Sequence, residues 1–303
     1  MFITDLSLWG NLHLGGMHAG GKRLLWSNAV ISVAAAATVA QTLHRTRPSG
    51  GGCGSEWMFS LGIGAATWCA YTWQRHVKST RESGLRSDHR AWHRKAWPRL
   101  RIAGLVLLPL AALPFASSVP LFYQGAPADW SFPIILSLAL TITILYAGLP
   151  GESGARRALR RIPGIKMLWI GLAWAIITAW WPMWWCSTHL NLSAVPLTMG
   201  CERFLIIAAL TLPFDLRDRT WDPAEMRTWP QLLGPRGTRV LAFAFLLAAV
   251  CLRWAFADPS TPWTVLGLLP MAVAVLFARE NRSPGHYAML DALLIVDAAI
   301  FLV

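Results

Sequence analysis

The sequence predicts an all-α, polytopic integral membrane protein, and two observations lead to that prediction. The chain of 303 residues is 55% hydrophobic and 14% charged, with a mean hydropathy of +0.43, whereas a soluble domain carries about 25% charged residues. Apolar runs of roughly 18 residues also recur along the chain, and a run of this length crosses a bilayer as a helix. We therefore expect residues 1–303 to form a single transmembrane domain.

Nine of these runs are candidate membrane spans. In chain order they lie at about residues 25–43, 57–76, 101–122, 132–149, 164–185, 197–214, 239–257, 263–279 and 287–303. Prolines in the third and fifth runs predict kinks there. Residues 1–20 lack a basic region that leads into an apolar one, so no cleavable signal peptide is expected. Residues 1–24 are then an N-terminal cytoplasmic segment.

Lysine and arginine are distributed unevenly between the two sides of the membrane in this arrangement. With the N-terminus in the cytoplasm, 23 of the 27 basic residues fall on the cytoplasmic side. The other four are Arg45, Arg47, Arg203 and Arg253. The positive-inside rule favours this orientation, as in a protein of a prokaryotic inner membrane. The net charge of +12 therefore reflects topology and contact with the lipid bilayer, and no nucleic-acid partner is expected.

Motifs for a structural metal or a nucleotide are weak. The five cysteines are scattered, without CxxC or Cys/His spacing. His89 and His93 are four residues apart in DHRAWHRKAW, a stretch that favours an interfacial helix rich in Trp and Arg over a metal-binding pair. Walker and GxGxxG motifs are absent from the sequence.

Three aspartates gather where the sixth run ends, in LTLPFDLRDRTWDP at residues 210–223. On a continuous helix, Asp215, Asp218 and Asp222 would lie within about 60° of arc. We expect the cytoplasmic loops at 77–100, 150–166 and 215–238 to bring polar groups to the same membrane face. One interpretation of the aspartates is a ligand site. The other is that they pair with arginines of a solvated loop, namely Arg217, Arg219 and Arg227.

A basic segment precedes the fifth run on that face. Two i, i+4 pairs would let one helix present a cationic wall, built from Arg156, Arg157, Arg160 and Arg161. Carboxylates that bind a divalent metal, together with arginine and lysine donors, suit a diphosphate group. The chain attached to such a diphosphate would lie among the apolar spans.

These residues resemble the UbiA superfamily of intramembrane prenyltransferases, which are nine-helix bundles with two aspartate-rich motifs that face a central cavity. FDLRDRTWD is similar to the second motif, where Asp218 and Asp222 match the paired acids and Asp215 fits the upstream polar position. RRALRRIPGIKMLWIGLAW is similar to the basic segment before the fifth helix, with Arg160 and Arg161 at its Lys-Arg positions.

The chain departs from the family at the first motif, which reads Asn-x-x-x-Asp-x-x-x-Asp. Alignment on Arg75 puts Ala70, Gln74 and Lys78 of AYTWQRHVK at the three ligand positions. Lys78 would repel a metal ion, so we expect Lys78 and Arg75 to contact the phosphates directly. Fixed positive charge would then replace one metal, with some loss of Lewis-acid assistance.

The resemblance implies a Mg²⁺-dependent enzyme that ionises an isoprenyl diphosphate to an allylic cation and transfers the prenyl group to an aromatic or lipid acceptor. The catalytic metal ligands that it implies are Asp215, Asp218 and Asp222. The implied diphosphate ligands are Arg75, Lys78, Arg160 and Arg161. The residues assigned to the cavity wall are Asn28, Tyr71, Gln74, Tyr146 and Trp174.

Three alternatives stay open. A terpene cyclase would let the cation react with its own alkenes, and Trp174 could stabilise that cation. Four further indoles of the fifth run are expected to anchor the span at the interface, namely Trp180, Trp181, Trp184 and Trp185. A non-catalytic relative would bind a prenyl lipid, which the lost first motif favours. An ion-coupled transporter would use Asp291 and Asp297, but their spacing of six puts them on different helix faces.

Overall fold

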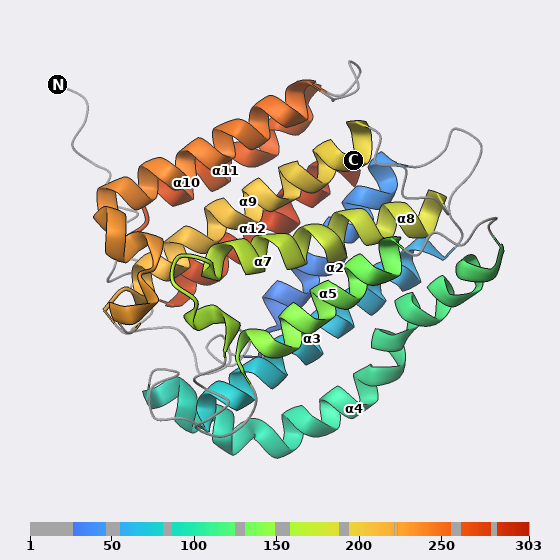
Figure 1. The fold of residues 1–303 in the computed structure, drawn as a ribbon, viewed down its shortest axis with the longest axis horizontal. Helices are drawn as coiled ribbons and strands as arrows, with labels where there is room; N and C mark the ends of the chain where they lie inside the picture. The colour runs from blue at the N-terminus through green and yellow to red at the C-terminus, as the bar shows by residue number, and fades with distance from the viewer. Residues whose placement is uncertain are drawn as a thin grey trace.

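The computed structural model describes residues 27–46, 55–80, 87–124, 131–148, 158–187, 194–220, 222, 224–255, 262–279 and 284–302. Every regular segment within these ranges is helical, which confirms the predicted all-α class. The helices run side by side as one bundle, with α4 along one edge and α10 along the opposite edge (Figure 1).

Each predicted span coincides with a helical segment. The elements are α2 (Ala29–Arg45), α3 (Glu56–Ser79), α4 (Ser87–Gln124), α5 (Ser131–Tyr146), η3 (Leu159–Arg161), α7 (Lys166–Ala175), η4 (Ile176–Trp180), α8 (Trp181–Ser187), α9 (Ala194–Asp218), η5 (Ala224–Met226), α10 (Trp229–Ala255), η6 (Pro262–Leu268), α11 (Leu269–Leu276) and α12 (Pro284–Leu302). In the bundle, α9 packs against α7 and α10, while α2 packs against α3 and α12.

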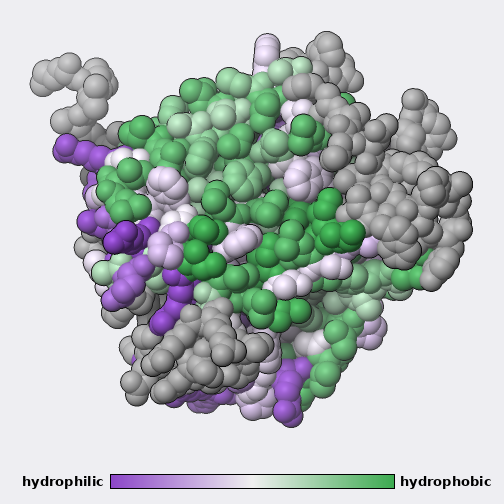
Figure 2. Space-filling model, in the orientation of Figure 1, coloured by the Kyte–Doolittle hydropathy of each residue, from purple (hydrophilic) through white to green (hydrophobic). Residues whose placement is uncertain are grey.

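Several helices are built to cross a membrane. Among the described residues, four helical stretches are long and apolar enough, namely Arg90–Val119, Lys166–Cys186, Val195–Asp218 and Trp229–Ala255. Ile102, Leu105 and Val106 of α4 are 61%, 64% and 72% exposed, and Figure 2 shows apolar side chains over much of the visible surface. Apolar surface of this extent matches lipid and not water. The chain is a multi-pass integral membrane protein, and its count of nine spans stays a prediction.

The loop predicted at 77–100 is largely helical, because α3 continues to Ser79 and α4 already begins at Ser87. In this N-terminal part of α4, His93 is fully buried. His76 of α3 stacks on Trp97 with ring centroids 3.5 Å apart. The side chain of His89 lies outside the described residues, so the predicted preference for an interfacial helix over a metal pair stays a prediction.

The fifth span contains a π-helical turn, η4, where a proline-induced kink was predicted. Pro182 has no N–H to donate to the carbonyl of Thr178, four residues earlier. The hydroxyl of Thr42 on α2 donates to that carbonyl instead, at 2.7 Å. The carbonyl that lacks its intrahelical donor therefore accepts a hydrogen bond from α2, which links α2 to the fifth span.

Two of the four indoles predicted to anchor this span do not lie at its surface. Trp181 and Trp184 are each 1% exposed. Trp181 packs edge-on against Phe59 of α3 at a centroid distance of 5.5 Å, and its Nε1 donates to the hydroxyl of Ser118 on α4 at 3.1 Å. These contacts join α3, α4 and α8, so the interfacial prediction is wrong for Trp181 and Trp184.

A buried ion network joins α2, α9, α10 and α12 near the N-terminal end of α9. Arg253 donates from Nε to Glu202 at 2.8 Å and from Nη2 to Asp297 at 3.0 Å. Arg45 donates to both carboxylate oxygens of Glu202, at 3.2 and 3.0 Å. Two of the arginines assigned to the outer side therefore stabilise the bundle, and Asp297 belongs to this network.

Candidate functional site

The C-terminal end of α9 carries Asp215 and Asp218, and Asp222 lies in the turn that follows. The prediction of one continuous helix through all three acids is wrong at Asp222, because α9 ends at Asp218. The backbone N–H of Asp222 still donates to the Asp218 carbonyl at 2.8 Å. The three carboxylates therefore stay near one another without sharing one helical face.

Lys166, the first residue of α7, joins two of these acids. Its Nζ lies 2.7 Å from Asp215 Oδ1 and 2.9 Å from Asp222 Oδ2. The amide of Gln231 donates to the Asp222 carbonyl at 3.0 Å, which holds the turn in place. The motif comparison does not identify Lys166, although it is the only lysine of the basic segment at 150–166. A lysine at the cytoplasmic start of a span was the available signal.

Asp218 has a different partner. Its carboxylate accepts two hydrogen bonds from Arg217, at 2.6 and 3.0 Å. The interpretation in which the aspartates pair with arginines of a solvated loop predicts this ion pair between Asp218 and Arg217. The Asp218 side chain is 35% exposed, against 3% for Asp215 and 13% for Asp222. Asp218 is therefore the most accessible carboxylate of the three.

A surface hollow of about 570 Å³ opens beside Asp222. Its lining includes two further arginines of the same segment, Arg219 and Arg227, together with Gln231. Positively charged side chains therefore line the hollow next to the acid cluster. A polyanion that approaches Asp222 from this side would meet these guanidinium groups first.

Four cations gather around the acid cluster. The charges that act on Lys78 include those of Arg160, Lys166 and Arg75, with Asp218 as an opposing charge. Within the described residues, no carboxylate lies at ion-pair distance from Lys78, and Arg160 Nε is buried without a hydrogen-bond partner. Neighbouring cations repel one another strongly where water is scarce. An anionic ligand would relieve that repulsion.

Asp291 of α12 and Arg161 of η3 also belong to this end of the bundle. Asp291 of α12 lies close enough to Arg75 and Arg217 for its charge to act on both. Asp291 therefore belongs to the acid and base cluster, although the sequence suggested it only for ion transport. Arg161 of η3 is half-buried. The other two arginines of the predicted cationic wall, Arg156 and Arg157, lie outside the described residues.

Aromatic side chains lie beside these cations. Trp174 donates from Nε1 to the Tyr71 hydroxyl at 3.3 Å, and the charge of Arg75 acts on Tyr71. Lys78 Nζ lies 5.5 Å from the centroid of the Tyr146 ring. Tyr71 and Tyr146, two of the five residues assigned to the cavity wall, are therefore neighbours of the basic groups, and Trp174 contacts Tyr71.

The other two residues assigned to the cavity wall link helices. Gln74 is 8% exposed, and its amide donates to the carbonyl of Thr143 on α5 at 3.0 Å. Asn28 is 2% exposed and donates to the hydroxyl of Thr72 on α3 at 3.0 Å. The Oδ1 atom of Asn28 is buried without a hydrogen-bond partner among the described residues. A role of Gln74 and Asn28 in the cavity stays a prediction.

The carboxylates can be tested for their fit to Mg²⁺, which prefers oxygen ligands. Oxygens of Asp215 and Asp222 converge on one point and hold a cation there, the ammonium of Lys166. Among the described residues, no three His, Cys, Asp or Glu side chains are grouped to ligate one metal ion. The donor chemistry fits Mg²⁺, and Lys166 is the group with which such an ion would compete.

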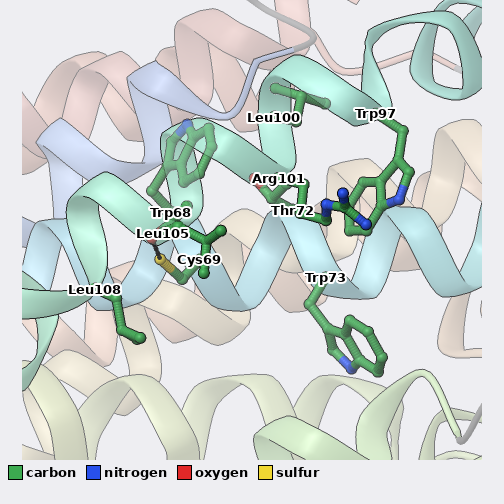
Figure 3. A pocket seen from close by; sticks show the side chains of 10 residues that line it. Trp68, Cys69, Thr72, Trp73, Trp97, Leu100, Arg101, Leu105 and Leu108 are labelled. Atoms are coloured by element: carbon green, nitrogen blue, oxygen red, sulfur yellow. Dashed lines mark hydrogen bonds between the residues drawn. The ribbon is translucent and has the colours of Figure 1, made fainter.

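A second cavity lies between α3 and α4, away from the acids. Its volume is about 210 Å³, and it is lined by Trp68 and Trp73 of α3 and by Trp97 and Arg101 of α4, which Figure 3 labels. The lining is mostly apolar. The residues that line it include none of the acids that diphosphate chemistry would use.

The fold of this chain is shared with UbiA homologues of known structure. The structure of a UbiA homologue from Archaeoglobus fulgidus bound to GPP and Mg²⁺ matches with a TM-score of 0.60 and 14% identity, over 93% of this chain and 100% of that chain. The structure of a UbiA homologue from the same organism bound to DMAPP and Mg²⁺ matches with a TM-score of 0.56 and 14% identity, over 93% and 99%. No family profile and no curated protein matches the sequence. The resemblance read from the motifs is confirmed at the level of the fold.

Proposed function

We propose that this chain is an intramembrane enzyme that binds an isoprenyl diphosphate and ionises it, so that the prenyl group passes to an acceptor. The observation that carries this proposal is the gathering of Lys78, Arg160 and Lys166 at the end of an apolar bundle. Cations suit the diphosphate, and apolar helices suit the chain. The fold supports the same ligand class, since its homologues were solved with GPP and with DMAPP.

In the proposed reaction, the bond between C1 of the prenyl chain and the diphosphate oxygen breaks, and its electron pair leaves with the diphosphate. Lys78, Arg75 and Arg160 stabilise this leaving charge where water is scarce. The aromatic faces of Tyr71 and Trp174 stabilise the allylic cation. A nucleophilic atom of an aromatic or lipid acceptor then bonds to C1, and the acceptor loses a proton.

Mg²⁺, when bound, would neutralise charge on the leaving diphosphate as a Lewis acid. Asp218 is the carboxylate that we assign first to such an ion because it is the most exposed. Asp222 and Asp215 would add oxygens when they are released from Lys166. Arg161 is proposed to bind the diphosphate beside Arg160.

A second candidate is a relative that binds a prenyl lipid without turning it over. It is favoured by the engagement of all three aspartates with Lys166 or Arg217. A terpene cyclase, the remaining alternative, would use the same diphosphate site without an acceptor. The three functions therefore differ in their products and share their ligand.

Purified protein in lipid nanodiscs, incubated with geranyl diphosphate and Mg²⁺, tests these functions. Pyrophosphate release and organic products are measured with and without an aromatic acceptor. Release that requires the acceptor supports prenyl transfer, whereas a hydrocarbon or alcohol formed without it supports cyclisation. Binding without release supports the non-catalytic candidate. Failure to bind geranyl diphosphate contradicts all three.

The matched control for this assay is Lys95→Ala. Lys95 is an exposed lysine of α4, and it has no part in the site. Lys78→Ala changes the same residue type at the site. Activity that falls in Lys78→Ala and not in Lys95→Ala therefore assigns the chemistry to this end of the bundle.

A further inference from the structure

Lys166 lies between two carboxylates at a point where a metal ion would compete with it. Its Nζ contacts one oxygen of Asp215 and one of Asp222, at 2.7 and 2.9 Å. A magnesium ion binds such oxygens at about 2.0–2.1 Å and keeps near-octahedral geometry. The ammonium and the metal therefore cannot occupy the space between these two oxygens together.

The surroundings favour the ammonium over the metal. Lys166 is tethered at the start of α7, so its ammonium group reaches the two carboxylates without the loss of translational freedom that a free ion would undergo. A magnesium ion would also have to give up part of its hydration shell to bind there. Its side chain is 12% exposed, and that of Asp215 is 3% exposed, so the pair interacts in a medium of low dielectric. The nearby charges of Lys78 and Arg160 repel a divalent cation further.

The same positive charges act in the opposite direction on a phosphate. Lys78 and Arg160 attract an anion, and Lys166 adds a third positive centre close to them. In a site with two aspartate motifs, a metal ion would supply that charge. Here Lys78 takes the place of an acid of the first motif, and Lys166 forms ion pairs with two acids of the second.

We propose that Lys166 is a resident cation that substitutes for a divalent ion at Asp215 and Asp222, and that a diphosphate group binds this site without Mg²⁺. The inference rests on the proposed function, because it takes an organic diphosphate as the ligand. Asp218 stays accessible to a metal ion. Mg²⁺ then assists ionisation of the ligand and is not needed for its binding.

Calorimetry on the detergent-purified full chain tests this inference with geranyl diphosphate and with inorganic pyrophosphate. Each ligand is titrated in excess EDTA and in saturating Mg²⁺. The wild-type dissociation constants should differ by less than about threefold between the two conditions. Lys166→Met should bind about tenfold more weakly in EDTA, the effect of one lost charge-assisted contact. Mg²⁺ should restore its binding because a metal ion can then reach Asp215 and Asp222.

Electron paramagnetic resonance with Mn²⁺ supplies a second measurement that does not depend on activity. Lys166→Met should bind one more Mn²⁺ ion than the wild type in the absence of any diphosphate. Lys166→Arg keeps the positive charge, so it should bind pyrophosphate in EDTA as the wild type does. Lys95→Met removes an exposed lysine of α4 and should change neither measurement.

Two results would overturn the inference. One is wild-type binding of geranyl diphosphate that occurs in Mg²⁺ and disappears in EDTA, which leaves the proposed function standing. The other is a Lys166→Met protein with no additional Mn²⁺ site and unchanged pyrophosphate affinity. Absence of geranyl diphosphate binding in both conditions overturns the proposed function together with the inference. If Lys166→Met does not fold, the wild type and Lys166→Arg still decide the outcome.

Discussion

Arg253 of α10 and Asp297 of α12 form an ion pair inside the bundle, with Nη2 and Oδ2 3.0 Å apart. Arg253 is 1% exposed and Asp297 is fully buried. The same guanidinium reaches Glu202 of α9, so three helices share one positive charge. Glu202 lies about 24 Å along α9 from Asp218, at ~1.5 Å per residue. The ion network is therefore remote from the proposed diphosphate site.

Asp297→Ala should destabilise the protein without weakening diphosphate binding. The substitution leaves a buried guanidinium with one carboxylate fewer, and breaking a buried pair in this way costs about 3–5 kcal/mol. Equilibrium unfolding in mixed micelles of SDS and a mild detergent measures the change in the free energy of unfolding. Glu225→Ala, which removes an exposed acid of η5, is the control. A loss below about 1 kcal/mol would show that Arg253 does not depend on Asp297.

Lys78→Ala should weaken the binding of a diphosphate by about 1.5–3 kcal/mol, the scale of one charge-assisted hydrogen bond. The loss should persist in saturating Mg²⁺, because the ammonium acts on the phosphate directly. Titration calorimetry with pyrophosphate measures it, and Lys95→Ala is the matched lysine control. Unchanged affinity in Lys78→Ala would remove this end of α3 from diphosphate recognition.

The positions of the helices could be predicted because each apolar run carries its own signal. The run at 197–214 lies within α9 (Ala194–Asp218). The boundary of α10 could not be predicted as well. This element begins at Trp229, ahead of the apolar run at 239–257, and its backbone is kinked at Gly234, where φ is +67° and the conformation is not helical. The short helical stretch before the kink holds Gln231 and lies outside the apolar run, so hydropathy does not reveal it.

The candidate site divides in the same way. Asp215, Asp218 and Lys78 were named from local sequence, since their spacing and neighbours lie within a few residues. Lys166 was missed because its partner Asp222 is 56 positions away. No local pattern reports a contact of that kind. Arg203 is a similar case, since it donates to Gln41 at 2.7 Å across 162 positions.

The orientation in the membrane is a further prediction. Cysteines introduced at Ser83 and Gly125, both outside the described residues, should react with an impermeant maleimide from opposite sides. The native cysteines are first replaced by serine, and labelling of intact and lysed cells is compared. Cys186 is disulfide-bonded and falls on the predicted outer side, where disulfides persist. Labelling of Ser83→Cys and Gly125→Cys from the same side would contradict the nine-span topology.

Asp218→Ala should separate binding of the ligand from its ionisation. Asp218 opposes the charge of Lys78, so its removal should leave diphosphate affinity unchanged or raise it. Mg²⁺-supported pyrophosphate release should fall about 100-fold or more, as expected when one electrostatic group that serves the transition state is lost.

Asp222→Ala should also lower pyrophosphate release, but it should weaken diphosphate binding as well, because Asp222 holds Lys166 in place. Calorimetry and product assays on both variants, with Glu225→Ala as the exposed-acid control, measure the two effects. If Asp218→Ala releases pyrophosphate at the wild-type rate, Asp218 serves only as the partner of Arg217, and the metal that assists ionisation is held elsewhere.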